Sequence, residues 1–581
     1  MGKKESIFKN NKDYIIPHGG CGEFGMNMSS FIMCGTHILI DTGVMFPDYD
    51  NIGVDGLFPK VEDFFEEVTV PDAIIITHGH EDHIGAFAYI LSRYPQIKVY
   101  CSAWTKELLL YKLMYNKMEG TEDEETGNKE IELQESLLLP GQSPKKELQQ
   151  KKTKLLLDQK YNIYEVSQKQ VLSIKSVKIE FFFLDHSIPQ SFGLCIKSQN
   201  HTYFHTGDFR FNKKNFYKKL NVDYLLVDST NSHKQKQDIS ERQIVSNLKN
   251  LIQKHSKSKL IITTFSSNFE RVKSVITACS DLKRHYSFVG TGLLKTVGIA
   301  LRLNLLSKED MKYFIPVEDV GVKNKNIVVL SSGCQGEYLS GFYRIVEGRC
   351  KNIKITQDDG VVFSSRIIPG REKVVARLKD KIVKQGARIY PSGDYHRSGH
   401  AGEEDIRSLI RELNPKVVIP VHGSYEQLWN TSKIATDMGK GSQIIESGTA
   451  MEVTDKELVQ VATVELEMNF IDSYSFHILS KDIIRQRVKI ASQGLVLFYG
   501  VYSFKNKGWL VPCSLEEIGL LPMENKLHED IISKIGTKIQ STSTVFDINK
   551  LKEEIRILIR KKCEKFYNKK PVVIVKLELK N

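Results

Sequence analysis

The sequence has no run of 18 apolar residues and no C-x-x-C pair among its nine cysteines. A membrane-spanning helix needs about 20 consecutive apolar residues, so we expect no membrane span. The residues that follow Met1 contain no apolar stretch, so we expect no signal peptide. Most cysteines stand in apolar surroundings, which is typical of reduced thiols in a protein core. No tandem repeat or low-complexity tract is visible either. We therefore expect a cytoplasmic globular protein without a membrane partner.

The chain has 581 residues, of which 41% are hydrophobic and 26% are charged, as is ordinary for a globular protein. This length predicts roughly two to four domains. Lys and Arg number 82 against 70 for Asp and Glu, which gives a formal net charge of +12. Such an excess fits a polyanionic partner such as nucleic acid, although solubility alone explains it almost as well.

The densest cluster of metal-binding side chains is the segment from His78 to His83, which holds three histidines and an aspartate in the pattern H-x-H-x-D-H. It follows a strand-like run at 73–77 and precedes a helix-like run at 84–91. Imidazole with carboxylate suits zinc, manganese or iron better than calcium. Four donors within six residues cannot all surround one tetrahedral ion, so the spacing predicts two metals. The alternative is a polar turn with incidental histidines.

Several other strand-like runs also end in a histidine or an aspartate. The residues at these ends are His186, Asp208, Asp228 and His422. Because parallel strands of an α/β fold present their carboxyl ends at one edge, we expect one site assembled from distant sequence. Asp41 also ends a strand-like run, but we expect it to cap a turn rather than to bind metal.

Changes in charge and in the pattern of helix-like and strand-like runs predict how the chain divides into domains. Residues 117–158 carry blocks of acidic and basic charge and are predicted to be an exposed insertion. Residues 232–355 alternate between helix-like and strand-like runs, which predicts an inserted α/β domain with its own parallel sheet. The predicted segments are 1–231 and 356–455 as the two parts of one domain, 232–355 as the insert, 456–468 as a linker, and 469–581 as a small C-terminal α/β domain.

These motifs resemble those of the β-CASP nucleases in the metallo-β-lactamase superfamily, and in particular the bacterial ribonuclease J family. The phrases that carry the resemblance are His186-Ser-Ile-Pro, His205-Thr-Gly-Asp-Phe, Asp228-Ser-Thr-Asn, Ser398-Gly-His400 and Pro420-Val-His-Gly. The resemblance runs from about residue 14 to the end. It implies an α/β protein built as a metallo-β-lactamase αββα sandwich, with an inserted β-CASP domain and a small C-terminal α/β domain.

The resemblance also implies which residues bind metal. One divalent ion is expected at His78, His80 and His186, a second at Asp82, His83 and His422, and Asp208 is expected to bridge them. The family uses zinc or manganese. We expect zinc, with manganese as the alternative.

Further site residues follow from the same resemblance. His400 is expected to protonate the leaving ribose oxygen, Asp228 to orient a histidine, and Glu241 to assist proton transfer. A pocket for a 5′-phosphate is expected from hydroxyl and backbone N–H groups of two loops. Its residues are Ser364, Ser365, His396, Arg397, Ser398, Gly399 and His400.

The implied function is hydrolysis of RNA, a reaction at ester bonds, both internally and by trimming from the 5′ end, in RNA maturation and mRNA decay. The implied partners are RNA, a second copy in a homodimer or a dimer of dimers, and components of an RNA-degradation complex. Two alternatives remain at this point. One is a β-CASP nuclease that acts on DNA or on 3′ ends, and the other is an inactive scaffold that binds RNA.

Overall fold

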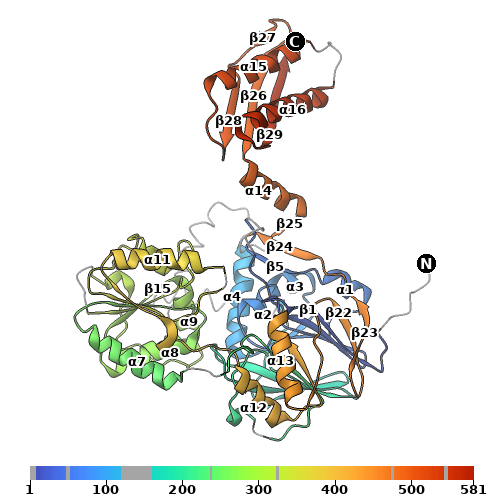
Figure 1. The fold of residues 1–581 in the computed structure, drawn as a ribbon. Coiled ribbons are helices and arrows are strands. Elements are labelled where there is room, and N and C mark those ends of the chain that lie inside the picture. Colours follow the sequence, from blue (N-terminus) through green and yellow to red (C-terminus); the bar gives the residue numbers. More distant parts are fainter. Residues whose placement is uncertain are drawn as a thin grey trace. The chain divides into compact units, whose positions relative to one another are not determined.

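The computed structural model describes most of the chain and divides it into two compact units (Figure 1). The first unit comprises residues up to 45 together with 58–468, and the second comprises 46–57 with 469–581. The described residues are 8–47, 53–118, 160–216, 218–235, 239–321, 326–368, 370–472, 477–541 and 547–580. The charged insertion expected at 117–158 lies outside them from residue 119 onward. No helix within these ranges is both long and apolar enough to cross a membrane.

Two large mixed sheets form the core of the first unit. The eight-stranded sheet has the order β23-β22-β1-β3-β4-β6-β7-β8. Its strands are β1 (Asp13–Gly19), β3 (Met28–Met33), β4 (Thr36–Ile40), β6 (Ala73–Ile75), β7 (Lys98–Cys101), β8 (Ile163–Glu165), β22 (Thr449–Val453) and β23 (Leu458–Thr463). The seven-stranded sheet has the order β21-β19-β13-β12-β11-β10-β9. Its strands are β9 (Val171–Ile174), β10 (Val177–Leu184), β11 (Ser191–Lys197), β12 (Thr202–His205), β13 (Tyr224–Asp228), β19 (Val417–Val421) and β21 (Gly441–Ser442).

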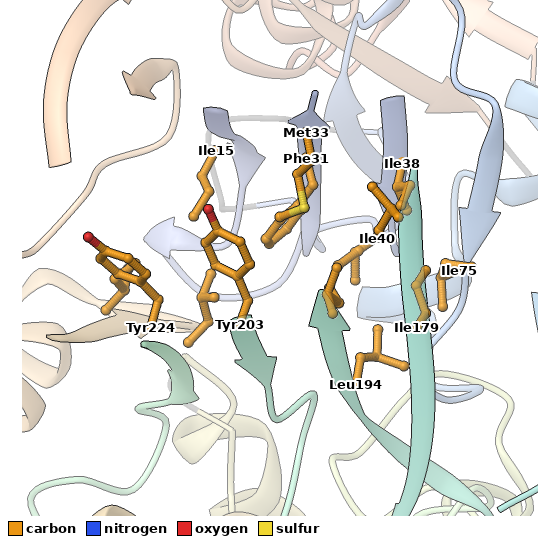
Figure 2. Close-up of a cluster of buried hydrophobic side chains, with 14 of the residues drawn as sticks. Ile15, Phe31, Met33, Ile38, Ile40, Ile75, Ile179, Leu194, Tyr203 and Tyr224 are labelled. Carbon is orange, nitrogen blue, oxygen red and sulfur yellow. The ribbon is translucent and has the colours of Figure 1, made fainter. Parts of the chain in front are cut away.

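The two sheets bury a common apolar layer, part of which is drawn in Figure 2. Ile15, Phe31 and Ile38 come from the eight-stranded sheet, and Ile179 and Leu194 come from the seven-stranded sheet. Successive side chains of a strand point to opposite faces, so alternate residues of the central strands enter this layer. Burial of each large aliphatic side chain contributes about 1.5–3 kcal/mol, which makes the layer the main support of the strand ends.

Helices cover the outer faces of these sheets. On the seven-stranded sheet lie α12 (Glu403–Leu413) and α13 (Tyr425–Asp437). The buried side chains Ile406, Leu409, Ile410 and Leu413 recur at helical spacing and pack against this sheet. The remaining helices of this layer system are α1 (Glu62–Glu67), α2 (Glu81–Ile84), α3 (Phe87–Arg93) and α4 (Ala103–Met118). Two short strands, β2 (Cys21–Gly22) and β20 (Gly423–Ser424), pair with each other in parallel and form a separate two-stranded sheet.

The inserted domain is a five-stranded, fully parallel sheet with helices on both faces. Its order is β15-β16-β14-β17-β18, with β14 (Leu260–Thr263), β15 (Tyr286–Val289), β16 (Val328–Ser331), β17 (Gly360–Phe363) and β18 (Arg388–Tyr390). One face packs on α7 (Glu241–Lys254), α8 (Phe269–Asp281) and α9 (Thr291–Arg302). The other packs on α10 (Gly341–Val346) and α11 (Glu372–Lys384).

This sheet corrects two of the predicted domain limits. The expected boundary at 355 is wrong, because β17 pairs with β14 and β18 pairs with β17, so the insert continues to residue 390. The expected linker at 456–468 is also wrong, because β23 pairs with β22 at the edge of the eight-stranded sheet. Edge strands commonly carry polar side chains that discourage further pairing, and the polarity of this segment has that origin.

The second unit is a small α/β domain. Its elements are β24 (Met468–Asp472), β25 (His477–Leu479), α14 (Lys481–Gln493), β26 (Leu495–Ser503), β27 (Gly508–Trp509), β28 (Ser514–Ile518), α15 (Asn525–Gln540), α16 (Ile548–Tyr567) and β29 (Val572–Lys580). The central strand β26 pairs with β27, β28 and β29. The stripe Leu551, Ile555 and Ile559 of α16 is buried in this domain's own core. Residues 46–57 join the unit through β5 (Gly56–Pro59) and a bond from the Asp55 N–H to the Ile471 carbonyl (2.9 Å).

Candidate metal centre

The H-x-H-x-D-H segment forms a tight turn between β6 and α2. His78 is buried two residues beyond the apolar run that ends in Ile76, and His80 is the residue that precedes the first turn of α2. Asp82 and His83 lie inside that turn. Side chains at the start of a helix diverge, so the turn presents its donors in two directions rather than one.

Three strand ends of the seven-stranded sheet meet this turn. The strands β12, β13 and β19 are parallel neighbours, and Asp228 at the end of β13 lies beside Val421 at the end of β19. Asp208 follows β12, and His422 follows β19 with a left-handed backbone (φ 56°). His186 arrives from β10 of the same sheet.

The first group of candidate ligands is His78, His80, His186 and Asp208, whose donor atoms all lie within 4.8 Å of one another. Nδ1 of His80 is 3.1 Å from Nε2 of His78 and 3.1 Å from Nε2 of His186. The Oδ2 atom of Asp208 is 3.4 Å and 3.7 Å from these two Nε2 atoms. A tetrahedral ion with bonds of about 2.0–2.1 Å requires ligand separations of about 3.3 Å, which these distances bracket.

The second group is Asp82, His83, Asp208 and His422. Nε2 of His83 is 3.7 Å from Oδ2 of Asp82 and 3.2 Å from Oδ1 of Asp208. Nε2 of His422 is 3.4 Å from Oδ2 of Asp82, while its Nδ1 hydrogen-bonds Oδ1 of Asp208 at 2.7 Å. Asp208 therefore turns one carboxylate oxygen toward each group. Its Oδ2 is buried and has no hydrogen-bond partner among the described residues, which fits an oxygen that serves as a metal ligand.

The protonation of the two groups differs because their charges differ. Burial lowers the pKa of His80 to about 3, and it also lowers the pKa of His78 and, strongly, that of His186. These imidazoles are neutral, which is the form that binds metal. Burial also disfavours the charged form of His83, but the carboxylates of Asp208, Asp82 and Asp41 outweigh it and raise its pKa well above the usual range.

The same carboxylates explain the remaining shifts. Asp208 and neighbouring aspartates raise the pKa of His422 to about 10 against the opposing effect of burial. Despite its burial, the pKa of Asp208 lies well below its usual range because His422 and His83 surround it. A buried cluster this rich in carboxylate favours cations, and its donor set of imidazole and carboxylate fits zinc or manganese.

Groups outside the two sets hold the candidate ligands in place. Asp41, with a left-handed backbone (φ 59°), accepts from Nδ1 of His83 at 2.7 Å and from the N–H and hydroxyl of Thr77 at 2.7 and 2.8 Å. The Nε2 atom of His83 is the one left for a metal, whose binding would displace the proton there, and the Asn27 side-chain nitrogen lies 3.1 Å from it. The expected turn-capping role of Asp41 is therefore incomplete, because the residue also orients a candidate ligand.

His186 is held from its other side. Its Nδ1 lies 2.8 Å from the carbonyl oxygen of Gly399, which fixes the ring so that Nε2 faces the first group. A Cβ at Gly399 would lie 2.6 Å from the His186 ring, so only glycine allows this approach. The loop that follows β18 of the inserted domain is thereby tied to the metal centre.

His400 and Asp228 lie beside the second group. Nδ1 of His400 is 2.9 Å from Oδ2 of Asp228 and 3.7 Å from Oδ2 of Asp208. Its ring centroid is 5.3 Å from that of His186 and 5.5 Å from that of His422. Burial lowers the pKa of His400, but Asp228 and Asp208 more than compensate and raise it. Asp208, Asp228, His400 and His422 also form a third set of donors within 4.8 Å.

The structure does not bring Glu241 into any of these groups. Glu241 begins α7, and its carboxylate lies 3.2 Å from the Arg271 guanidinium and accepts from the Ser274 hydroxyl at 2.9 Å. These contacts favour a role in joining α7 to α8 over the expected role in proton transfer.

The residues expected to bind a 5′-phosphate come from two adjoining loops. Ser364 is buried, and its hydroxyl donates to the Tyr395 carbonyl. Ser365 is buried too, and its side chain opposes the rise that burial causes in the pKa of the Cys334 thiol. The Ser398 hydroxyl accepts from the Asn231 amide at 2.7 Å. The Ser364 hydroxyl thus already has a partner within the protein.

The basic side chains of these loops are His396, Arg366 and Arg397. His396 keeps a buried Nδ1 without a partner among the described residues, and burial lowers its pKa to about 3. Burial also lowers the pKa of Arg366 and of Arg397. The Arg366 guanidinium lies 3.3 Å from the Asn231 side-chain oxygen, close to Ser398.

Comparison with known proteins shows which families share this architecture. Four family models match successive segments: "Metallo-beta-lactamase superfamily" at 24–244, "Ribonuclease J, beta-CASP domain" at 257–382, "Zn-dependent metallo-hydrolase RNA specificity domain" at 394–440, and "Ribonuclease J C-terminal domain" at 482–577. The expected fold, a metallo-β-lactamase domain with a β-CASP insert and a C-terminal domain, is confirmed.

Curated relatives match over nearly the whole chain. Ribonuclease J of Helicobacter pylori (strain B128) is 28% identical over 96% of this chain and 78% of that protein. Ribonuclease J of Mycoplasma genitalium is 26% identical over 91% and 90%, and that of Mycolicibacterium smegmatis is 26% identical over 96% and 95%.

A solved structure of a protein of unknown function from Enterococcus faecalis V583 shares the fold, with a TM-score of 0.51 and 15% identity over 77% of this chain and 100% of that one. Two of the four matching models are specific to ribonuclease J, and the relatives bear the same name. The chain therefore belongs to the ribonuclease J family of metal-dependent nucleases, in the β-CASP group of the metallo-β-lactamase superfamily.

Proposed function

We propose that this chain hydrolyses RNA phosphodiester bonds with two divalent metal ions, both internally and by trimming from the 5′ end. The observation that carries the two-ion proposal is the position of Asp208. Its two carboxylate oxygens face two separate sets of donors, Oδ2 toward His78 and His186 and Oδ1 toward His83. A single ion would leave one of these sets without a metal.

The proposed ligands are His78, His80 and His186 for one ion and Asp82, His83 and His422 for the other, with Asp208 shared. The donors are mostly imidazole, which favours zinc, and manganese is the alternative. When bound, such ions neutralise charge on the phosphoryl oxygens and activate water for attack on phosphorus.

The remaining chemistry falls to residues beside the ions. We assign His400 to protonation of the leaving ribose oxygen, because its imidazole lies next to both metal sets while Asp228 holds Nδ1 at 2.9 Å. We assign the proton transfer to Nε2, the ring nitrogen that does not contact Asp228. Asp228 in this proposal fixes the ring and stabilises its charged form.

Trimming from a 5′-monophosphate end requires a site for a terminal phosphate. We propose the loop from His396 to His400, together with Ser364 and Ser365, as that site. Support comes from the tie between Gly399 and His186, which joins the loop directly to the metal centre. Since the Ser364 hydroxyl already has a partner, the charged groups of Arg366 and Arg397 and the buried Nδ1 of His396, which has no partner among the described residues, are the stronger candidates for phosphate contacts.

We also propose a homodimer, or a dimer of dimers, and a role in RNA maturation and mRNA decay with partners in a degradation complex. Leu497, Tyr499 and Ile574 lie on the face of the C-terminal sheet that alternates with its core, and Ile518 of β28 shares that face. Tyr499, Ile518 and Ile574 are 40%, 52% and 41% exposed. A sheet face of this kind supports self-association. Tyr499→Asp should lower the sedimentation mass, whereas Val383→Asp, on an exposed site of α11, should not.

The test of the reaction is digestion of one RNA carrying either a 5′-monophosphate or a 5′-triphosphate, with DNA of the same sequence as a second substrate. Metal content is measured on the same preparations. His400→Ala should slow both cleavage modes by about a hundredfold or more, because both need a protonated leaving group. The matched control is His285→Ala, an exposed histidine of the inserted domain that should leave both rates unchanged.

Ser365→Ala separates end recognition from chemistry. If Ser365 contacts the terminal phosphate, the preference for 5′-monophosphate should fall roughly tenfold to a hundredfold, or about 1.5–3 kcal/mol, while internal cleavage survives. Equal slowing of both RNAs would remove Ser365 from the pocket. Cleavage of DNA at the rate of RNA would contradict the substrate, and RNA binding without cleavage at full metal content would contradict the enzyme.

A further inference from the structure

The segment that carries His186 is held by an unusual set of backbone contacts. The carbonyl groups of three consecutive residues, Asp185, His186 and Ser187, accept hydrogen bonds from two residues of the described part of the chain, Arg210 and Glu270. Arg210 donates its backbone N–H to Asp185 (2.7 Å) and its Nη2 to His186 (3.0 Å). Glu270 donates its backbone N–H to Ser187 (3.3 Å).

Arg210 and Glu270 are also paired with each other. Nη2 of Arg210, the same atom that donates to the His186 carbonyl, lies 2.5 Å from Oε1 of Glu270. The Arg210 residue is only 2% exposed, so its guanidinium has little competition from water at this pair. A guanidinium is planar and rigid, and any rotation that breaks its bond to Glu270 also moves the atom that holds His186.

The two residues belong to different domains. Arg210 lies two positions after Asp208 in the metallo-β-lactamase domain, whereas Glu270 is in the first turn of α8 in the inserted domain. The first N–H groups of a helix have no partner within it, and α8 gives one of them to Ser187. A carboxylate at this position is itself stabilised by the helix dipole. The first turn of α8 in the inserted domain therefore contacts the segment 185–187, which carries the candidate ligand His186.

We propose that Arg210 and Glu270 are positioning residues, through which the inserted domain fixes His186 at the metal centre. The inference rests on the proposed role of His186 as a metal ligand. Its consequence is that the insert, besides any contact with substrate, sets the geometry of one metal set. Loss of the pair should loosen the His186 segment while the bond from His186 to Gly399 persists.

The experiment measures cobalt(II) binding to metal-depleted full-length protein by competition with a chelator, and records the visible spectrum of the cobalt-loaded protein. The variants are Glu270→Ala, Glu270→Gln and Arg210→Lys. Glu270→Ala retains the backbone N–H to Ser187 but removes the partner of Arg210. The control is Arg302→Lys, which alters another ion pair between the two domains, Arg302 with Glu107 (3.2 Å), that does not touch a metal set.

Glu270→Ala and Arg210→Lys should weaken the binding of one cobalt ion roughly tenfold to a hundredfold and shift its absorption bands, the usual cost of losing an outer partner of a ligand. Glu270→Gln keeps an acceptor and should restore part of the affinity. At saturating metal, kcat for RNA should fall while KM changes less than twofold. Arg302→Lys should match the parent protein throughout.

Unchanged affinity and spectrum in both Glu270→Ala and Arg210→Lys would overturn the proposal, as would a rise in KM alone, which would assign the pair to RNA binding. His186→Ala separates this inference from the one beneath it. If His186→Ala loses one cobalt ion but the pair variants do not, only the positioning role fails. If His186→Ala retains both ions, the proposed ligand set itself fails. Thermal melting of each variant shows whether lost affinity comes from lost folding.

Discussion

Replacing Asp41 with asparagine should selectively impair one of the two proposed metal sets. The carboxylate accepts from Nδ1 of His83 (2.7 Å) through Oδ2 and from the Thr77 N–H (2.7 Å) through Oδ1. Asparagine is nearly the same shape and tolerates the left-handed backbone of this position (φ 59°), so the change adds no strain. It has only one acceptor oxygen, however, and cannot serve both donors.

The consequence is a change of tautomer at His83. If the amide oxygen keeps the Thr77 N–H, the NH₂ group faces Nδ1 of His83, which must then accept. The proton moves to Nε2, the atom that lies 3.2 Å from Oδ1 of Asp208 and that we assign to the metal. Losing such an outer partner costs about tenfold to a hundredfold in metal affinity, or about 1.4–2.8 kcal/mol.

Zinc titration of metal-depleted protein against a chelator would resolve the two ions. Asp41→Asn should weaken one ion and leave the other, at His78, His80 and His186, within about twofold. Asp359→Asn is the matched control, because Asp359 is also buried and also accepts a backbone N–H, from Lys259 at 2.9 Å, but in the inserted domain. Two ions bound with unchanged affinity, or both weakened equally, would refute the assignment of Asp41 to His83.

Three further outcomes follow from the contacts already described. Asp208→Ala should abolish hydrolysis and lower the occupancy of both ions, since one carboxylate faces both sets; full metal content with activity would exclude the bridge. Gly399→Ala places a Cβ 2.6 Å from the His186 ring and should lower kcat roughly tenfold or more at unchanged unfolding midpoint. Burial lowers the pKa of His18 to about 3 and of His37 to about 4, so only the unfolded chain takes up these protons as the pH falls below about 6.5. These two histidines together should make the free energy of unfolding in urea about 4 kcal/mol smaller at about pH 5 than at about pH 7.5. Replacing both with residues that do not titrate should remove that part of the pH dependence, and an unchanged profile would contradict neutral burial.

The meeting of the candidate ligands was predictable because it depends on strand direction. His186, Asp208, Asp228 and His422 each follow a strand-like run, and neighbouring parallel strands end at the same edge of a sheet. The order of the strands was not needed for this inference. The divergence of Asp82 from His78 was also predictable, since a strand followed at once by a helix must turn between them.

The partners of the ligands were not predictable, because nothing local identifies them. Asp41 and His83 are 42 positions apart, and His186 and Gly399 are 213 positions apart. Asp41 looked like a turn residue, and indeed it occupies a left-handed turn position; its second role depends on the register between β4 and β6. A polar residue directly after a strand that adjoins a metal loop is the one signal that could have identified it.

The misplaced domain limits have a different physical origin. The apolar run at residues 360–363 predicts a strand. Such a run indicates only that the strand is buried on both faces, as in any parallel sheet. It does not record which sheet supplies the neighbours. The register of β17 beside β14, Gly360 with Leu260, adds 388–390 to the same sheet through β18. The loop from 391 to 400 therefore leaves the inserted domain and enters the metal centre. An insert that ended at residue 355 would have placed His400 within the sandwich. Instead, the candidate acid His400 and the Gly399 contact to His186 both lie on the loop that follows the last strand of the insert.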